Sequence, residues 1–526
     1  MKYLVLFIVS ISAFSSIYKI IDDPKDAISI RYSLLKSAKQ EIFSSKYIFH
    51  KDFAAYTSLA LLRQKSVEIH DNNLEPDIRL LVDRFGKFFK HTPLEVLLHL
   101  KRDHGIEFKF YNDLLSKKVI TKKIIEGYDP VLALLTLPIA LFLPPISPKP
   151  YIKVVEHRLH DKLFIVDGEY MVTGGRNIQD PYFDKSESTY VDRDVFTNGK
   201  AASDSREHFL KFWNNPASTY PEYSKRYCRK NYKKEYYKNN RIFGNTEDCL
   251  EAMRLKGKAI LDEHFDKIEP QFKTFKIDEN FHHKIVAEEE DDETVEFVGD
   301  KLDEKGNYIS VMSKRLVEIA NNAKDKIVIE NAYFVPTPTL LSILDKKLHE
   351  GIKITILTNS LSSTDNNEAY SGYFKFRPIL MKLGPINNKI KLYEYQGDAM
   401  GSNYGNAIHS KSATIDDEYS IIGSYNLDQL SEYYNTEVAL ISRNPKKAIE
   451  LRESIESHIN YSYQVGIDGV PCNPNVCAFT TDKHGNLLNG AQLHPNASPE
   501  KISWVNRYMK VLDKDNFLSK WILKHL

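Results

Sequence analysis

The sequence is poor in cysteine, nearly neutral in charge, and without an apolar run long enough to span a membrane comfortably. Only four of its 526 residues are cysteine. Lys and Arg number 72 against 71 Asp and Glu, so there is no electrostatic reason to expect a general nucleic-acid binder. A hydrophobic content of 42% excludes a disordered chain and allows a sizeable core. The length predicts two or three domains, or one large pseudo-symmetric pair.

The N-terminus carries a short apolar segment. Residues 3–14 follow Lys2 and are too few for a membrane span. The positive start, the apolar middle and the small residues Ala13 and Ser15 at the exit are typical of a secretory signal. No cysteine lies near that exit, which argues against a lipoprotein anchor. We expect residues 1–20 to be a signal peptide or an N-terminal anchor, and the body to be exported, whether periplasmic, membrane-associated or secreted.

The four cysteines form two local pairs in the sequence. Cys228 and Cys249 flank a stretch rich in Lys and Tyr, and Cys472 and Cys477 lie close together. An exported protein favours two disulfides that close short loops. A zinc site is the competing interpretation, but neither half of the chain has a CxxC pair.

Hydrophobic spacing indicates two α/β halves that repeat one pattern, a helix and then strands. The predicted elements are a helix at 28–38, strands at 79–83 and 106–110, a helix at 316–323, and strands at 326–330 and 352–357. The expected segments are a first domain at 21–215, a Lys/Tyr-rich insert at 216–285, a second domain at 286–465 and a C-terminal extension at 466–526. The acidic run 288–293 predicts a solvated loop. A duplicated α/β domain explains this pattern better than a solenoid does.

Three further segments each leave two interpretations open. The run 131–146 contains three prolines and is either a buried loop-helix element or an apolar lip that touches lipid. The tail 504–526 is a packing helix or a membrane anchor, with packing favoured. The Lys-rich stretch 225–238 is a solvated face or a contact for anionic head groups, with the solvated face favoured.

Two segments share a pattern of residues that carry chemistry. The first has His160, Lys162 and Asp167, and the second has His409, Lys411 and Asp416, so both read HxKxxxxD. Each continues through an apolar strand to a G-x-x-N sequence, which includes Gly175 and Asn177 in the first half and Ser424 and Asn426 in the second. One such match is weak evidence, but two matches with the same continuation are not accidental.

Strand geometry explains the spacing within each motif. Residues two apart share a face, so His160 projects with Lys162, and His409 with Lys411. Asp167 falls where its strand reaches a tight turn, and the aspartate of the second motif does the same. There each aspartate can anchor the backbone or its own motif instead of reaching a substrate. The small residues of the G-x-x-N sequences allow close backbone approach, and each Asn can donate its amide hydrogens.

A phosphodiester is the substrate class that needs such a set twice. Its transition state spreads negative charge over oxygens that two Lys and two Asn can stabilise without a metal or another cofactor. One imidazole can attack phosphorus while the other protonates the leaving alkoxide, and in-line geometry requires the two rings to face each other. The expected catalytic set is His160, Lys162, Asp167, His409, Lys411 and Asp416.

At these residues the chain resembles the phospholipase D superfamily, which is defined by paired HKD motifs, and within it the bacterial cardiolipin synthases of the C type. The resemblance runs from about residue 27 to residue 465, without the insert. The further segments that carry it are 174–183, 192–195, 332–336, 357–361 with Asp365, 423–428 and 435–437.

The resemblance implies two phospholipase D-like α/β/α sandwiches, related by a pseudo-twofold axis, with one active site at their seam. It implies that His160 is the nucleophile that forms a phosphohistidine, and that His409 is the general acid and then the base. A downstream carboxylate would orient each histidine: Glu437 in the second half, and Asp192, with Asp194 as second choice, in the first. The alternative for both Asp192 and Asp194 is an ordinary strand-end carboxylate.

The family resemblance points to a phospholipid substrate at a membrane surface, with hydrolysis or transfer to an alcohol or phosphatidylglycerol acceptor. A metal-independent nuclease of the same superfamily is the alternative, although charge and export argue against nucleic acid as a partner. A lipid-binding module without catalysis is the third hypothesis, and both motifs being intact argues against it. The head group, the acceptor and the oligomeric state are not determined by the sequence.

Overall fold

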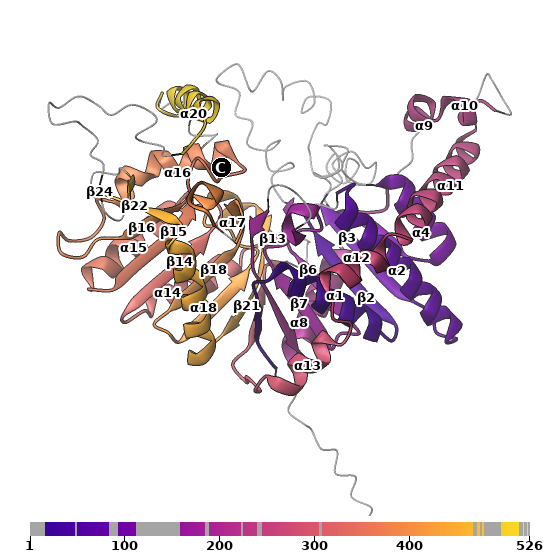
Figure 1. The fold of residues 1–526 in the computed structure, drawn as a ribbon, viewed down its shortest axis with the longest axis horizontal. Helices are drawn as coiled ribbons and strands as arrows, with labels where there is room; N and C mark the ends of the chain where they lie inside the picture. The colour runs from indigo at the N-terminus through magenta and orange to yellow at the C-terminus, as the bar shows by residue number, and fades with distance from the viewer. Residues whose placement is uncertain are drawn as a thin grey trace, which may run out of the picture.

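The described residues of the chain form two similar halves side by side (Figure 1). The structure, a computed structural model, describes residues 16–47, 50–83, 93–111, 158–184, 189–221, 225–238, 245–303, 308–402, 404–466, 471–473, 476–477, 496–514, 519 and 523. Each half is built on one large mixed sheet.

The first sheet has three parallel strands at one side and antiparallel strands at the other. In spatial order its strands are β1 (Lys19–Ile21), β9 (Asp194–Asn198), β7 (Tyr170–Gly174), β6 (Leu163–Val166), β2 (Glu41–Lys46), β3 (Asp77–Asp83), β4 (Glu107–Tyr111) and β10 (Ser218–Thr219). Strands β2, β3 and β4 are parallel, and β6 turns back against β2.

The second sheet repeats this order and adds two strands at one edge. Its strands are β11 (Glu296–Gly299), β21 (Val438–Ser442), β19 (Tyr419–Gly423), β18 (Lys411–Ile415), β14 (Lys326–Asn331), β15 (Lys353–Asn359), β16 (Lys391–Tyr395), β22 (Ser462–Val465), β23 (Pro471–Asn473) and β24 (Val476–Cys477). Strands β14, β15 and β16 are the parallel set, and β18 turns back against β14. The predicted duplication of one α/β domain is therefore confirmed.

Short strands and helices complete the two halves. The short strands are β5 (Arg158–Leu159), β8 (Tyr190–Val191), β12 (Lys301–Leu302), β13 (Tyr308–Ile309), β17 (Ala407–Ile408) and β20 (Asn435–Thr436). The helices of the first half are α1 (Pro24–Ser37), α2 (Phe53–Asp71), α4 (Leu94–His104), η1 (Asp180–Phe183) and α8 (Gly199–Trp213). Those between the halves in sequence are α9 (Lys225–Asn231), α10 (Lys233–Tyr236), α11 (Thr246–Phe265), α12 (Ile268–Phe275) and α13 (Phe281–Glu288). Those of the second half are α14 (Met312–Asn321), α15 (Pro338–His349), α16 (Asn367–Leu380), η2 (Gly397–Met400), α17 (Gln429–Tyr433), α18 (Pro445–Ile459) and α20 (Pro499–Leu512).

Local sequence explains where the predicted elements begin. The predicted helix at 28–38 is α1, which starts at Pro24 because the side chain of Asp23 accepts hydrogen bonds from the next free backbone N–H groups. The strands predicted at 79–83 and 106–110 are β3 and β4. In the second half the predicted helix is α14, and the predicted strands are β14 and β15.

A shared apolar core joins the two halves. Helix α8 packs on the first sheet and on β11 of the second, and α18 packs on the second sheet. Phe209 and Trp213 of α8 belong to one buried cluster with Leu451 and Ile455 of α18 and with side chains of both sheets. Two further clusters lie under the outer helices, one in each half. The seam is therefore an interior with close packing, which holds the halves in one orientation.

The insert expected at 216–285 packs on the first half and is not a separate unit. Strand β10 belongs to the first sheet, and α11 packs so closely on α4 that a Cβ at Gly257 would lie 2.1 Å from the carbonyl oxygen of Glu95. Cys228 and Cys249 form the predicted disulfide between α9 and α11. The second predicted disulfide stays a prediction, although β23 and β24 place Cys472 directly opposite Cys477.

Two segments differ from their predicted descriptions, the end of the leader and the acidic run. Strand β1 begins at Lys19 and Tyr18 is fully buried, so the first sheet already includes residues assigned to the leader. The acidic run 288–293 is mostly exposed, as predicted, but Asp292 is buried and accepts hydrogen bonds from Ser442 and Thr294. The predicted leader core 3–14 and the apolar run 131–146 lie outside the described residues.

The C-terminal helix α20 packs against α16, and Val505 and Leu512 are buried there, as the packing interpretation predicts for this part of the tail. None of the helices in the described part of the chain combines the length and the apolar character that crossing a bilayer requires.

One buried arginine connects the two halves electrostatically. Arg193, between β8 and β9, lies 2.6 Å from an oxygen of Asp22 and 2.9 Å from an oxygen of Glu330 on β14. It also donates to the hydroxyls of Ser412 at 2.9 Å and Ser454 at 2.6 Å. Burial opposes its charge, but Asp22 and Glu330 more than offset this and raise its pKa above the ordinary value.

We expect Arg193→Met to lower the free energy of unfolding by about 3–5 kcal/mol, because it removes a buried arginine that pairs with the buried carboxylate of Glu330 and leaves that carboxylate only His458 and Ser410. Calorimetry of the purified chain would show a lower midpoint of thermal unfolding. Arg443→Gln is the control, because its ion pair with Glu418 is largely exposed and its loss should leave the midpoint unchanged. Equal midpoints for the two variants would contradict the role of Arg193.

Candidate active site

Each motif histidine follows a short strand that pairs with the other half. Strand β5 runs parallel to β20, and β17 runs parallel to β8. The backbone N–H of His160 donates to the carbonyl of Thr436 at 3.2 Å, and that of His409 donates to the carbonyl of Val191 at 2.7 Å. These two ladders cross the seam, so they fix both histidines where the halves meet.

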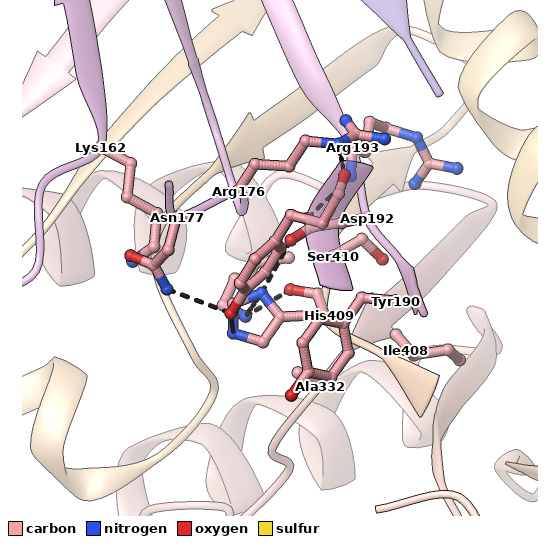
Figure 2. Close-up of polar contacts among 12 residues, drawn as sticks. Lys162, Arg176, Asn177, Tyr190, Asp192, Arg193, Ala332, Ile408, His409 and Ser410 are labelled. Carbon is pink, nitrogen blue, oxygen red and sulfur yellow. Dashed lines mark hydrogen bonds and ion pairs between the residues drawn. The ribbon is translucent and has the colours of Figure 1, made fainter. Parts of the chain in front are cut away.

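The carboxylate that orients each histidine comes from the opposite half. Nδ1 of His160 lies 3.0 Å from both carboxylate oxygens of Glu437, which follows β20. Nδ1 of His409 lies 2.8 Å from Oδ2 of Asp192, which follows β8, and Figure 2 shows these two side chains facing each other. Glu437 and Asp192 were the expected carboxylates, but the expectation that each serves its own half is wrong.

The second choice for the first-half carboxylate, Asp194, has a different role. Its Oδ2 forms an ion pair with Arg31 at 2.8 Å and accepts a hydrogen bond from Arg176 at 3.3 Å, so it is tied to two arginines of its own half. It holds Arg176, whose guanidinium also donates to backbone carbonyls near α1. Asp194 therefore supports the frame of the site and contacts neither histidine.

The small residues of the two G-x-x-N sequences support these carboxylates. A Cβ at Gly175 would lie only 1.9 Å from Oδ1 of Asp192, so only glycine leaves room for that carboxylate. At the equivalent position Ser424 donates its hydroxyl to Glu437, and Ser431 donates to the other oxygen of Glu437 at 2.7 Å. The close backbone approach predicted for Gly175 is thus seen, while Ser424 adds a hydrogen bond.

The two motif lysines lie beside their histidines, as strand alternation predicts. Nζ of Lys162 is 3.0 Å from Nε2 of His160, and Nζ of Lys411 is 3.2 Å from Nδ1 of His409. Each lysine also donates to the backbone carbonyl of its histidine. The histidines themselves lie just before β6 and β18 and not within a regular strand, so the shared direction comes from the strand ends.

The motif aspartates lie at the far end of β6 and β18 and anchor the backbone. Asp167 accepts three backbone N–H groups at residues 39–41, and Asp416 accepts three at residues 324–326. Both have positive φ, 51° and 58°, in the tight turns that the sequence predicts. Their place in the expected catalytic set is therefore corrected, because they hold the strands that carry the site and contact neither histidine.

The two motif asparagines each have a buried side-chain oxygen that lacks a hydrogen-bond partner among the described residues. Nδ2 of Asn177 donates to the hydroxyl of Tyr182 at 3.1 Å. Asn426 occupies the equivalent place in the second half. Orphaned polar atoms at two equivalent buried positions are characteristic of a site whose hydrogen bonding is completed by a ligand or water.

The site also contains tyrosines that motif spacing does not predict. The hydroxyl of Tyr182 lies 3.3 Å from Nε2 of His409, and the rings of Tyr190 and Tyr333 also contact His409. Both of the latter donate to Asp365, at 3.0 and 2.8 Å. Tyr182 and Asp365 fall in segments that carry the family resemblance, but no periodicity in the sequence indicates which way these side chains point.

Burial sets the charge states of the site. It lowers the pKa of His160 well below the ordinary value, and the nearby charges of Lys162 and Lys411 lower it further. The pKa of His409 is also lowered by burial and by Lys411, but Asp192 opposes this shift. The charges of Lys411 and His409 both act on His160, in agreement with the carboxylate pairing across the seam that holds both histidines where the halves meet.

The remaining titratable groups show the same competition between burial and partners. Burial lowers the pKa of Lys411 to about 8, although Asp192 opposes the shift. Burial opposes the charge of Asp192, but His409 outweighs it and holds the pKa at about 2. Burial also lowers the pKa of Lys162 and raises that of Glu437. An anion bound between the lysines would favour their charged forms.

We expect Asp192→Asn to lower the pKa of His409 further, because this carboxylate is the main influence that favours the protonated ring. A pH titration of the histidine rings by NMR would measure the change. Asp194→Asn is the matched control: it removes a nearby carboxylate that pairs with arginines, so the titration of His409 should not move. An equal shift in both variants, or none in Asp192→Asn, would contradict the pairing across the seam.

Comparisons with known proteins agree on one family. A family model described as "Cardiolipin synthase, PLD-like domain" matches residues 316–459. An uncharacterized protein of Helicobacter pylori strain J99 is 26% identical over 457 residues, which cover 85% of this chain and 80% of that protein. Cardiolipin synthase C of Escherichia coli K12 is 25% identical over 465 residues, 84% of this chain and 85% of that protein.

A solved structure extends the likeness in fold to nearly the whole chain. The crystal structure of phosphatidylserine synthase from Haemophilus influenzae covers 97% of this chain and 95% of that chain, with a TM-score of 0.58 and 13% identity. Two equivalent halves that share one site at their seam are the arrangement expected of paired HKD motifs. The second half of the chain therefore resembles the PLD-like domain of cardiolipin synthases, and most of the chain is similar to cardiolipin synthase C.

Proposed function

We propose that the protein is a phosphatidyltransferase that acts on phospholipids through a phosphohistidine. The observation that carries this is the exchange of carboxylates at the seam, which presents two oriented imidazoles, each with a lysine, at one site. Its relatives include a protein named cardiolipin synthase C, which supports a phospholipid substrate. A phosphate group between Lys162 and Lys411 would compensate for the loss of hydration that lowers the pKa of both lysines.

In the first step, Nε2 of His160 attacks phosphorus and forms an N–P bond. The P–O bond to the departing alcohol breaks, and His409 gives its Nε2 proton to that oxygen. In the second step, the hydroxyl of the acceptor gives its proton to His409 and attacks phosphorus. The N–P bond then breaks and releases His160 for the next cycle.

The environments of the two histidines favour this order of roles. His160 has the more strongly lowered pKa, so its ring is neutral and its Nε2 can act as a nucleophile. His409 keeps a carboxylate that favours the protonated ring, and a bound phosphate would favour that form further. Two titratable groups whose environments separate their pKa values are characteristic of an acid and a nucleophile in one site.

Burial favours transfer over hydrolysis. His160 and His409 are only 8% and 5% exposed, and both motif lysines are more buried still. A site that keeps water away from a phosphohistidine allows an alcohol acceptor to compete for it. An acceptor with a free hydroxyl, such as the head group of phosphatidylglycerol, fits this requirement.

We also propose that the body of the protein is exported and works against a membrane. The disulfide between Cys228 and Cys249 supports an oxidising compartment, since such bonds persist outside the cytoplasm. The apolar N-terminal segment supports export for the reasons given by its sequence.

We expect the purified protein to convert phosphatidylglycerol in vesicles, with cardiolipin as the product of transfer and phosphatidic acid as the product of hydrolysis. His160→Asn and His409→Asn should each lower the rate at least about a thousandfold, and His409→Asn should retain a phosphatidyl group on His160. Chromatography of the lipids and the intact mass of the protein measure these outcomes. His349→Asn, on an exposed face of α15, is the control. Unchanged lipids with the wild-type protein would sink the proposal.

We expect kcat/KM to fall as the pH rises through about 8, because Lys411 is charged below its pKa of about 8 and neutral above it. Lys411→Arg should move this alkaline limb to higher pH, since the guanidinium stays charged, even if the rate is lower. Lys326→Arg is the control, because Lys326 pairs with Asp417 at the far end of the sheet. An alkaline limb at the same pH in Lys411→Arg would exclude this lysine as its origin.

A further inference from the structure

The segment of residues 225–238, which forms α9 and α10 and is here named the basic arm, concentrates positive charge. It has seven Lys and Arg residues and one acid, Glu235, in a chain whose totals of 72 and 71 nearly balance. The side chains of Lys225, Arg229, Lys230, Lys233, Lys234 and Lys238 are exposed. Such a local excess creates a positive field that the rest of the chain does not cancel at short range.

These cations differ from the lysines of the neighbouring helices. Lys258 forms an ion pair with Asp262, and Lys267 forms one with Glu263. Most other exposed lysines nearby also pair with an acidic residue. No ion pair joins the six exposed cations of the basic arm to any residue in the described part of the chain. Within the described part of the chain, the charge of these six side chains is therefore not neutralised by ion pairs.

The opposite side of the basic arm fixes it to the body. Cys228 is disulfide-bonded to Cys249 of α11, and Tyr232 and Tyr236 are buried. The hydroxyl of Tyr232 donates to Glu95 at 2.9 Å. Figure 1 shows α9 and α10 projecting beyond α11 and away from the sheets. The cations are thus held outward on a stapled support, which lowers the entropic cost of binding a surface.

The basic arm stands at the same edge of the first half as the active site. Glu95, its contact on the body, is in the first turn of α4, the helix that follows the carboxyl end of β3. At that end Asp83 accepts the backbone N–H of Leu159, which directly precedes His160. A flat surface that approaches this edge would therefore meet the arm on the side of the first half where the chain leads to His160.

We propose that the basic arm docks this edge of the protein on the anionic surface of a lipid bilayer. The inference rests on the proposed function, because a phospholipid substrate has its phosphate in the plane of the head groups. Anionic bilayers attract clusters of Lys and Arg beside the membrane, with roughly a fivefold gain in affinity for each basic residue close to the surface. We choose a bilayer over nucleic acid because the arm stands at the same edge of the first half as the segment that leads to a site for lipid phosphate.

The test compares two variants of the full chain that each lose four exposed lysines. The arm variant is Lys230→Gln, Lys233→Gln, Lys234→Gln and Lys238→Gln. The matched control is Lys346→Gln, Lys353→Gln, Lys382→Gln and Lys391→Gln, all exposed and placed at the amino-terminal edge of the second sheet or at the ends of the helices that lead to it. Cosedimentation with phosphatidylcholine vesicles, with and without phosphatidylglycerol, measures binding, and thermal unfolding checks that both variants fold.

We expect the wild type and the control to bind the anionic vesicles better than the neutral ones, with binding that weakens as salt rises. The arm variant should bind the anionic vesicles at least about tenfold more weakly. Equal binding by the arm and control variants would overturn the proposal. So would preferential binding of single-stranded DNA by the wild type that the arm variant loses.

Vesicle binding needs no turnover, so this result is separate from the proposed chemistry. His409→Asn removes a group of the active site and leaves the arm intact, so it should sediment with anionic vesicles like the wild type. If the wild type binds through the arm but converts no phospholipid, the docking surface stands and the proposed reaction fails. If phospholipid is converted but the arm variant binds as tightly as the control, the reaction stands and the docking surface fails.

Discussion

Neither half of this protein orients its own histidine. Glu437 of the second half holds His160, and Asp192 of the first half holds His409. All four side chains are buried, so each hydrogen bond forms where water does not compete and where an unpaired charge would be costly. Separating the halves would remove the partner of both histidines at once. The site therefore exists only when the seam is closed, and the rest of the fold can be understood as what keeps it closed.

Several features on different length scales maintain that seam. The ladders of β5 with β20 and of β8 with β17 set the register between the halves. The apolar cluster around α8 and α18 fixes their orientation, and Arg193 ties β14 to the segment that carries Asp192. Closest to the chemistry, Gly175 leaves the space that Asp192 fills. Each feature helps to hold the same few contacts between the carboxylates and the histidines.

The exclusion of water that strengthens these contacts also disfavours the protonated forms of the lysines and histidines when no ligand is bound. Burial lowers the pKa of Lys162, Lys411 and both histidines, so their protonated forms are disfavoured until an anion binds. A phosphodiester supplies that anion, and its arrival displaces water from groups that have few other partners. The cations of the active site itself, Lys162 and Lys411, are buried. The proposed contact with anionic head groups is placed instead on the basic arm, outside the catalytic seam.

The sequence by itself determined the duplication, the two HxKxxxxD motifs, the turn aspartates that anchor backbone, and the disulfide of Cys228. These depend on strand alternation, turn geometry and short loops, which neighbouring residues control. Only the tertiary structure decided which carboxylate serves which histidine, because the partners are 217 and 277 residues apart and both assignments fit the same motifs. The tyrosines around His409, the connection through Arg193 and the early start of the first sheet were decided in the same way. Contacts across a seam depend on how two sheets are oriented, and no local pattern in the chain encodes that orientation on its own.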